Sequence, residues 1–201
     1  MLKLYDLHRS GNCYKVRLLL AFLGLAYEKI PVDANAGEHK TAEFLKISPR
    51  AQLPVIQDET RVIWDSMAIL VYLAAHYGNG NWLSADPYAM AATMQWLALD
   101  QNEIRYGLGR ARAITLGNPT RFAQLGNLEE CREFANTALE VLAGRLEAKD
   151  WLVDDAPTIA DVACYPYVAM ASDGNISTAP FPAVRRWLAR IETLPGYVPP
   201  P

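Results

Sequence analysis

The first part of the chain changes its apolar period from that of a strand to that of a helix and back. Apolar and polar residues alternate over residues 1–5 as in a half-buried strand, and from Cys13 the apolar residues lie on one helical face until Gly24. A second strand is expected over residues 27–32. Because a helix connects it to the first strand, the two should pair in parallel. A short helix is expected over residues 41–47.

Residues 52–66, QLPVIQDETRVIWDS, predict a β-hairpin that leads into a helix. Two apolar segments rich in β-branched residues flank a polar turn at residues 58–60. Asp65 and Ser66 then stand where a helix cap is needed, ahead of the apolar segment 67–77. Together with the preceding βαβ unit, this ββα pattern predicts a mixed sheet of four strands with helices packed on it.

Pro54 is unusual at the head of a strand, because proline lacks the N–H that a sheet ladder needs. A cis peptide bond costs little only before proline, so the bond between Leu53 and Pro54 is the natural place for one. Such a bond would turn the main-chain N–H and C=O of Leu53 outward, as an open edge for an extended peptide. We therefore interpret the N-terminal unit as a holder for a peptide-like ligand.

Strand patterns disappear in the second half of the chain. Residues 79–87, NGNWLSADP, are the expected linker between a domain at 1–78 and a domain at 88–201. Thr158 and Asp161 have the spacing of a capping box, which specifies the start of a helix. Helix-like apolar spacing extends over residues 88–116, 128–149, 158–171 and 183–193. The second domain is therefore expected to be all-helical.

The composition is that of a soluble globular protein: of 201 residues, 51% are apolar and 20% are charged, with a net charge of −3. This balance argues against nucleic acid as the main partner. The longest apolar run, residues 67–75, is too short to cross a bilayer, so no membrane partner is expected. Cys13, Cys131 and Cys164 are too far apart in sequence to suggest a metal site. Their odd number and the lack of a signal peptide point to a cytoplasmic protein.

An α/β unit followed by a helical one, with an open strand edge and a capping box, resembles the glutathione transferase superfamily over nearly the whole chain. The resemblance implies a thioredoxin-like α/β N-terminal domain (βαβ-ββα) followed by an all-α C-terminal domain, with glutathione as the co-substrate. The motifs that carry it are SGNCYKVRLLL at the first helix, GEHKTAEFL in the loop, QLPV before the hairpin, DS at the third helix and TIAD in the second domain.

In this superfamily the loop before the first helix points at the glutathione sulfur, and three residues here resemble functional ones. Ser10 resembles the catalytic serine of theta-type members, and its hydroxyl can donate a hydrogen bond to a thiolate. Asn12, together with Ser10, resembles the threonine–asparagine pair of bacterial nu-type members. Cys13 resembles the beta-class cysteine that forms a mixed disulfide with glutathione. We rank them in this order; the alternative for Cys13 is a buried residue of the first helical turn.

The resemblance also implies a set of residues that hold the tripeptide. The hydroxyl of Ser66 and the free amides of the helix N-terminus suit the γ-glutamyl carboxylate, and Asp65 suits the ammonium group. Leu53, before Pro54, would offer its main chain to the cysteinyl residue. Three further residues resemble positions that bind the glycyl carboxylate in theta-like members: His39, Lys40 and Gln52. A solvated surface loop explains His39 and Lys40 about as well.

The second domain is expected to form the electrophile pocket with its first long helix. Arg105 resembles an arginine that faces the second substrate in theta-type members, and Tyr106 or Arg110 could share that wall. A basic, solvated helix face explains these arginines almost as well. Members of the superfamily are mostly symmetric dimers packed through their third and fourth helices, and a homodimer is expected on that ground.

Two classes of function fit these residues. The first is a glutathione transferase that ionises the glutathione thiol and adds it to a small hydrophobic electrophile, or reduces a peroxide. Glutathione-dependent disulfide reduction and dehalogenation are variants of this class. The second is a non-catalytic module that resembles a glutathione transferase and only binds or assembles. Because the glutathione frame over residues 52–66 is intact, the enzyme is favoured.

Overall fold

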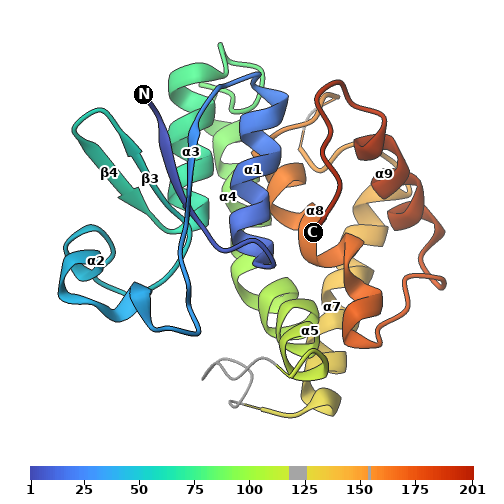
Figure 1. Cartoon of the computed structure of the whole chain (residues 1–201). Helices are drawn as coiled ribbons and strands as arrows, with labels where there is room; N and C mark the ends of the chain where they lie inside the picture. The colour runs from blue at the N-terminus through green and yellow to red at the C-terminus, as the bar shows by residue number, and fades with distance from the viewer. Residues whose placement is uncertain (118–125, 154) are drawn as a thin grey trace.

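Figure 1 shows the computed structural model of the chain, which describes residues 1–117, 126–153 and 155–201. A small sheet with its helices lies on one side, and a group of helices lies on the other. The predicted fold class is confirmed, because an α/β unit of thioredoxin-like topology precedes a helical one.

The α/β unit contains a four-stranded sheet with the order β2-β1-β3-β4. β1 and β2 are parallel, whereas the pairs β1–β3 and β3–β4 are antiparallel. The predicted βαβ-ββα order is therefore confirmed. Along the chain the elements are β1 (Lys3–Asp6), α1 (Gly11–Phe22), β2 (Glu28–Pro31), the 3-10 helix η1 (Glu38–Lys40), α2 (Ala42–Ile47), β3 (Val55–Asp58), β4 (Arg61–Trp64) and α3 (Ser66–Tyr77).

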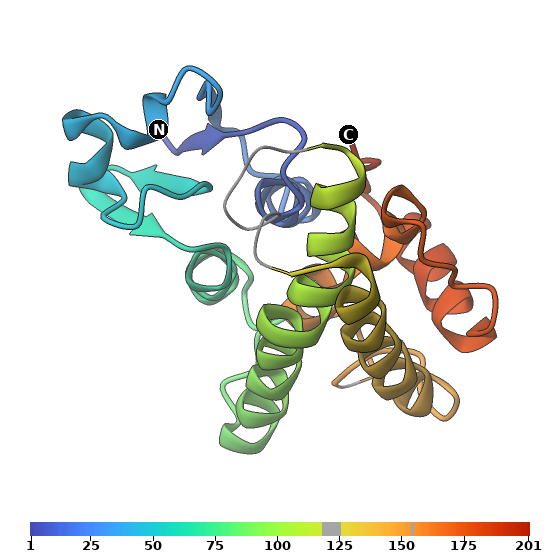
Figure 2. The same cartoon turned by 90° about the horizontal axis from the view of Figure 1, so that it is seen from below.

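Different helices cover the two faces of the sheet. Leu4 and Ile56 belong to the large core formed with α1 and α3. Val55, the neighbour of Ile56 on β3, instead packs with Phe44 of α2, where the ring of Tyr5 meets Phe44 edge-on with centroids 6.1 Å apart. Figure 2 shows α1 and α3 end-on between the sheet and the helical unit. The alternation of side chains along each short strand thus produces two separate cores.

The helical unit differs from the prediction in one element. Residues 88–116 were expected to form one regular helix, but the middle of this segment is a π-helix of ten residues. The spacing of apolar residues shows which face of a helix is buried, but it does not show which carbonyl each N–H bonds to. The π-helix could therefore not be predicted from that spacing. The elements are α4 (Pro87–Leu99), the π-helix η2 (Asp100–Gly109), α5 (Arg110–Thr115), α7 (Leu128–Leu146), α8 (Ile159–Ala169), the 3-10 helix η3 (Ala171–Gly174) and α9 (Pro182–Glu192).

The capping box at the start of α8 is confirmed. Thr158 Oγ1 accepts a hydrogen bond from Ala160 N–H at 3.2 Å, and Asp161 Oδ2 accepts one from Thr158 N–H at 2.9 Å. Asp161 Oδ1 also accepts from the main chain of Leu152 at 3.2 Å and from the Trp187 indole at 2.9 Å. One carboxylate therefore connects α8, α9 and the segment that follows α7.

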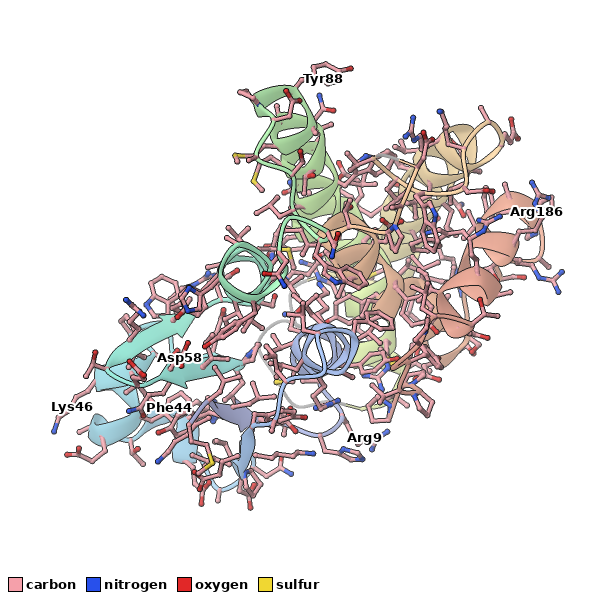
Figure 3. The ribbon with its side chains drawn as sticks, turned by 90° about the horizontal axis from the view of Figure 1, so that it is seen from above. Arg9, Phe44, Lys46, Asp58, Tyr88 and Arg186 are labelled. Atoms are coloured by element: carbon pink, nitrogen blue, oxygen red, sulfur yellow. The ribbon has the colours of Figure 1, made fainter. Side chains whose placement is uncertain are left out.

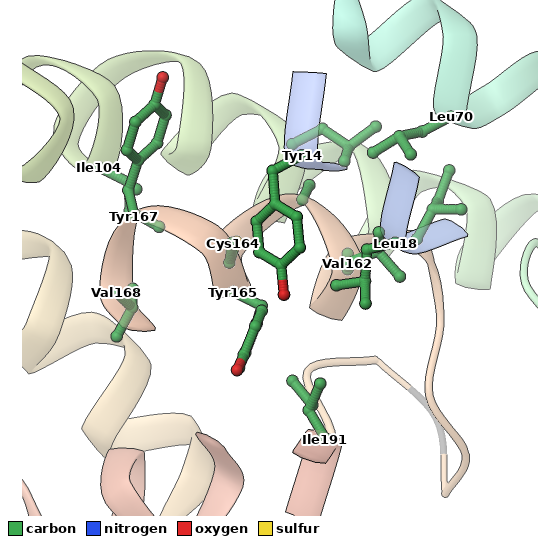
Figure 4. Packing of buried hydrophobic residues seen from close by; sticks show 14 of the residues in the cluster. Tyr14, Leu18, Leu70, Ile104, Val162, Cys164, Tyr165, Tyr167, Val168 and Ile191 are labelled. Atoms are coloured by element: carbon green, nitrogen blue, oxygen red, sulfur yellow. The ribbon is translucent and has the colours of Figure 1, made fainter. Parts of the chain in front are cut away.

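The larger of the two hydrophobic cores extends across both units. Figure 4 shows buried side chains of α1, α3 and α8 packed against one another, among them Tyr14, Leu18, Leu70, Val162 and Tyr165. As a consequence, α1 does not rest on the sheet alone. One of its sides packs on α8 of the helical unit, so the position of its N-terminus depends on both units.

Candidate functional site

Three loops meet at one end of the sheet. In the pair β1–β3, Tyr5 lies opposite Val55, and in the pair β3–β4, Val55 lies opposite Trp64. The chain that leaves β1, the chain that enters β3 and the chain that leaves β4 therefore lie side by side. The predicted site residues on these three loops are Ser10, Leu53 and Asp65.

Ser10 is the N-cap of α1. Its Oγ accepts a hydrogen bond from Cys13 N–H at 3.3 Å, and its own N–H bonds to Leu7 C=O at 2.9 Å. The bond from Cys13 uses a lone pair of the oxygen, so the hydroxyl hydrogen can be donated to a ligand. The side chain is half-buried, and the first amides of α1 add positive potential beside it. This arrangement suits a thiolate.

Cys13 is fully buried behind Ser10. Its Sγ accepts a hydrogen bond from Leu7 N–H at 3.4 Å, and burial raises the pKa of its thiol to about 12. A thiol that is both buried and protonated is a poor nucleophile. The structure thus favours the alternative for Cys13, a buried residue of the first helical turn.

Asn12 lies on the first turn of α1 and is half-buried. Its Oδ1 atom is buried, and no group in the described part of the chain hydrogen-bonds to it. Because buried amide oxygens in proteins normally have a partner, this atom has a hydrogen bond left to make with a ligand or with water. Asn12 therefore stays a candidate beside Ser10.

The peptide bond between Leu53 and Pro54 is cis, as predicted. Gln52, the residue before Leu53, is held by Ser48: Ser48 Oγ donates to Gln52 C=O at 2.9 Å and accepts from Gln52 N–H at 3.2 Å. Within residues 1–117, 126–153 and 155–201, no hydrogen bond reaches the main chain of Leu53. Its N–H and C=O are therefore available to an extended ligand.

Asp65 and Ser66 form the predicted cap of α3. Asp65 Oδ1 accepts from Met67 N–H at 2.9 Å, and Oδ2 lies 3.4 Å from the Arg50 guanidinium. Asp65 has φ +78°, a backbone conformation that costs a non-glycine residue about 1–3 kcal/mol and that concentrates at functional sites. Ser66 is the first residue of α3 and is buried. The loop thus directs a carboxylate and a helix N-terminus toward the same end of the sheet.

The residues predicted to bind the glycyl carboxylate lie on two different segments. His39 and Lys40 lie on η1, and Gln52 precedes the cis bond. Lys40 and Gln52 are exposed, whereas His39 is half-buried. Among the described residues no partner bonds His39 Nδ1, and burial, followed by the charge of Lys40, lowers the pKa of His39. A neutral imidazole with an unpaired buried nitrogen suits a ligand that offers a hydrogen bond.

The predicted electrophile wall contains two groups that face different neighbours. Arg105 Nη1 donates to Gln101 Oε1 on the same element at 3.0 Å. Burial raises the pKa values of Asp100 and Tyr167, and the charge of Arg105 partly opposes both rises. Tyr106 is 37% exposed and carries the Arg110 guanidinium 4.5 Å from its ring centroid. Arg110 in turn lies 3.7 Å from Glu130, while Tyr106 approaches Phe134, both on α7. Arg105 therefore bonds within η2, whereas Tyr106 and Arg110 contact α7.

Sequence reasoning missed a buried ion pair behind the site. Lys15 Nζ lies 2.5 Å from Asp100 Oδ2, and both side chains are completely buried. The ammonium also lies 5.0 Å from the centroid of the Tyr167 ring. Burial raises the pKa of Asp100, and the Lys15 charge opposes that rise. A signal was present, since Lys15 stands four residues before Leu19 on the apolar face of the first helix.

The sequence matches two family models. The model "Glutathione S-transferase, N-terminal domain" matches residues 1–75, and "Glutathione S-transferase, C-terminal domain" matches residues 121–195. The chain belongs to the glutathione S-transferase family. The sheet with its cis bond lies in the first matched region, and α7 to α9 lie in the second.

Similar proteins align with nearly the whole length of this chain. Disulfide-bond oxidoreductase YfcG of Escherichia coli (strain K12) is 33% identical over 194 residues, which cover 93% of this chain and 88% of the relative. The structure of a glutathione S-transferase from Pseudomonas fluorescens is 31% identical, has a TM-score of 0.91 and covers 98% of both chains. The glutathione transferase URE2P6 from Phanerochaete chrysosporium, in complex with oxidized glutathione, is 27% identical with a TM-score of 0.86, over 97% of this chain and 92% of that one.

These matches confirm the predicted enzyme class, a glutathione transferase, and support glutathione as its co-substrate. Neither the non-catalytic module nor the disulfide reductase is favoured over a transferase. In the part of the chain that the structure describes, no group of three or more His, Cys, Asp or Glu side chains could hold a metal ion. No helix of the described residues is both long enough and apolar enough to cross a membrane.

Proposed function

We propose that this transferase ionises the glutathione thiol at Ser10 and adds the sulfur to a small hydrophobic electrophile, or uses it to reduce a hydroperoxide. The observation that carries the proposal is the hydrogen bonding of Ser10 at the N-terminus of α1. Ser10 is a helix N-cap whose hydroxyl hydrogen is available, at the end of the sheet that also holds the cis bond and Asp65.

The energy that Ser10 must supply is modest. Lowering the thiol pKa by about two units requires about 2.7 kcal/mol of preference for the anion. A hydrogen bond to a charged group contributes about 1.5–3 kcal/mol, and a helix N-terminus about 0.3–1 kcal/mol. The two together reach the required value, with the thiol proton leaving to solvent. The thiolate then forms a C–S bond to the electrophile, and the electron pair of the bond that breaks goes to the leaving group or to the atom that takes up a proton. With a hydroperoxide, the thiolate attacks the outer oxygen, the O–O bond breaks to release an alcohol, and a second glutathione converts the sulfenic acid to glutathione disulfide and water.

The rest of glutathione is proposed to follow the three loops. Its γ-glutamyl end lies at the N-terminus of α3, with Ser66 and the first amides on the carboxylate and Asp65 on the ammonium. Its cysteinyl residue pairs with the main chain of Leu53, whose hydrogen-bonding groups are available. Its glycyl carboxylate is proposed to lie near three polar residues: His39, Lys40 and Gln52.

The electrophile is proposed to lie between Ser10 and η2. Tyr167 supports this placement, because its ring packs against Gly11, next to Ser10, and the charge of Arg105 partly opposes the rise that burial causes in its pKa. Arg105 is proposed to form the near end of the wall. Tyr106, with Arg110 against its ring, would form the far end of that wall beside α7.

We also propose a cytoplasmic homodimer with the domain division 1–78, 79–87 and 88–201. Apolar side chains on α4 support the dimer, since Met90 and Met94 are each 40% exposed on one face of the helix and Tyr88 is 84% exposed. Figure 3 shows Tyr88 at the outer end of α4. Asp86 caps α4 through Ala89 N–H at 2.8 Å, which supports a linker that ends there.

Glutathione-dependent disulfide reduction is the second candidate, and the likeness to disulfide-bond oxidoreductase YfcG is the observation that supports it. In this reaction a glutathione thiolate attacks a disulfide, one sulfur leaves as a thiol, and a second glutathione resolves the mixed disulfide. Asn12, with its unpaired buried oxygen, is the residue to test. Turnover of a small disulfide that Asn12→Ala abolishes and Ser10→Ala preserves would favour this candidate.

The experiment that tests the first proposal is a titration of bound glutathione, followed through thiolate absorbance, in the wild type and in Ser10→Ala. The pKa of the bound thiol should rise in Ser10→Ala, and turnover of aryl halides, isothiocyanates or cumene hydroperoxide should fall about 10–100-fold at neutral pH. Ser84→Ala is the matched control, because Ser84 Oγ also accepts a main-chain N–H, that of Asp86 at 3.1 Å. An unchanged thiol pKa in Ser10→Ala would refute the proposal.

A further inference from the structure

The carbonyl groups of the loop that carries Ser10 are each held by a hydrogen bond. Leu7 C=O accepts from Ser10 N–H at 2.9 Å, and His8 C=O accepts from Arg17 Nη2 at 2.8 Å. Both of these donors belong to the α/β domain itself. The loop is therefore partly fixed from within its own domain.

The third carbonyl of the loop is held from the other domain. Arg9 C=O accepts from Arg112 Nη1 at 2.8 Å, and Arg112 lies on α5. Figure 3 shows Arg9 extending outward from this loop, so its side chain takes no part in the contact. The carbonyl of Arg9 shares a rigid peptide plane with the nitrogen of Ser10. A force on that carbonyl therefore acts directly on the residue proposed to meet the sulfur.

Arg112 is itself fixed in one geometry. Its side chain is buried, at 8% exposed, and its Nε donates to Asp173 Oδ2 of η3 at 2.8 Å. Because the guanidinium is planar, a bond at Nε and a bond at Nη1 together set its orientation. Asp173 and Arg112 thus form a chain of hydrogen bonds from the helical domain to the loop before α1.

A second contact from the helical domain lies on the other side of Ser10. The ring of Tyr167 packs against Gly11 so closely that a Cβ atom at this position would lie 2.5 Å from Cε1 of the ring. Ser10 is therefore flanked in sequence by two residues, Arg9 and Gly11, that each contact the helical domain. Neither contact requires a ligand.

We infer that Arg112 is a positioning residue, which holds Ser10 through the Arg9 carbonyl so that the contact between the two domains controls how readily bound glutathione ionises. This inference rests on the proposed function of Ser10. It assigns a role to a buried residue that no sequence motif marked.

The test compares Arg112→Met with the wild type across pH. The variant keeps the apolar stem and removes both hydrogen bonds. The pKa of bound glutathione should rise by about one unit, so kcat/KM at pH 6.5 should fall about tenfold and recover as the pH is raised. The KM for glutathione should change less than kcat, because the tripeptide frame is intact. Arg112→Lys, which can still donate to the Arg9 carbonyl, should restore part of the activity.

Arg190→Met is the matched control. Arg190 also bonds a main-chain carbonyl and a carboxylate, both of Asp150, at 2.9 and 2.5 Å, but it does so on α9. Its removal should leave the pH profile unchanged. If Arg112→Met does not yield folded protein, Asp173→Asn replaces it, because Asp173 is 38% exposed and only orients the guanidinium. This variant should show the same pH-dependent loss, about two- to threefold.

A cycle with Ser10→Ala separates the inference from the proposal on which it rests. Because Arg112 acts through Ser10, adding Arg112→Met to Ser10→Ala should cause no further change in the pKa of the bound thiol. An Arg112→Met or Asp173→Asn protein with the wild-type pH profile overturns the inference, and so does a loss that is equal at every pH. If instead Ser10→Ala leaves the thiol pKa unchanged, the proposed role of Ser10 is wrong.

Discussion

Two buried carboxylates of this transferase have different kinds of partner. The one inside the helical domain has neutral hydrogen-bond donors, and the one at the boundary with the α/β unit has a charged donor. Asp161, inside the helical domain, accepts hydrogen bonds from two main-chain amides, a threonine hydroxyl and the Trp187 indole. Asp100, at the boundary, has the ammonium of Lys15 as its partner. Burial raises the pKa of both carboxyls, opposed by neutral donors at Asp161 and chiefly by the charge of Lys15 at Asp100.

The two arrangements respond differently to the loss of one partner. Asp161 would keep several donors after any single deletion. Asp100 would keep none, since no group in the described ranges hydrogen-bonds its Oδ1 atom. The boundary pair forms only when α1 and η2 lie in register, so we interpret it as a device for docking specificity, at a cost in desolvation.

The largest expected effect comes from breaking the boundary pair on one side. Lys15→Met removes the hydrogen-bonded counter-charge of buried Asp100 and leaves only the weaker attraction of Arg105. It should lower the free energy of unfolding by about 3–5 kcal/mol at neutral pH. Replacing both residues, as in Lys15→Met with Asp100→Leu, should recover most of that loss, because two apolar side chains avoid the desolvation of two charges. Guanidinium unfolding followed by tryptophan fluorescence measures both.

The recovery is the decisive part of this experiment. A double variant that is as unstable as Lys15→Met would show that the pair contributes more than the mutual neutralisation of two buried charges. A Lys15→Met protein within about 1 kcal/mol of the wild type would show that the pair is solvated in solution, as exposed pairs are.

A smaller effect is expected where the domains touch without charge. Gly11→Ala would place a Cβ atom 2.5 Å from the Tyr167 ring and should cost about 1–3 kcal/mol through overpacking. Gly144→Ala is the control within one domain: nothing lies within 4 Å of a Cβ there, so the substitution should stabilise α7 by about 0.5–1 kcal/mol. Equal effects of the two substitutions would contradict the close contact at Gly11.

The sequence predicted the parts of this molecule that depend on local chemistry. The cis bond at Pro54, the cap at Asp65 and the box at Thr158 each follow from what one side chain does to its own backbone, and each was found. The spacing of apolar residues also predicted the order of strands and helices, because each strand and helix has one buried face.

Contacts between distant segments could not be predicted in this way. Lys15 and Asp100 are 85 residues apart, and Arg112 lies 103 residues from Arg9. Apart from the place of Lys15 on an apolar helical face, nothing in the sequence marked these residues as contacts. The π-helix adds to the difficulty, since a change of helical register alters which side of η2 each residue faces. Sequence spacing alone therefore cannot show which residues of η2 share a face, and the grouping of Arg105 with Tyr106 and Arg110 stays a prediction.

The smallest expected effect concerns a third carboxylate, which lies within the α/β unit and whose pKa moves the other way. Asp58, on the outer part of the sheet in Figure 3, accepts hydrogen bonds from Tyr77 at 2.5 Å and Tyr72 at 2.7 Å. Donation from Tyr77 is the chief reason that the pKa of Asp58 is lowered. Because the folded-state pKa lies below the unfolded value of about 3.9, this stabilisation is present above that pH and is lost as the pH falls through the folded-state pKa.

Tyr77→Phe should therefore lower the free energy of unfolding by about 1 kcal/mol at pH 7, and the difference from the wild type should shrink as the solution is acidified below pH ~4. Tyr88→Phe is the control, because Tyr88 is 84% exposed and its hydroxyl should contribute nothing at any pH. A Tyr77→Phe difference that stays constant down to the acid limit would mean that packing, and not the charge of Asp58, is what the hydroxyl supports. In that case the Tyr77 hydroxyl would contribute equally beside a charged or a neutral Asp58, and only the boundary between the domains would depend on a charge.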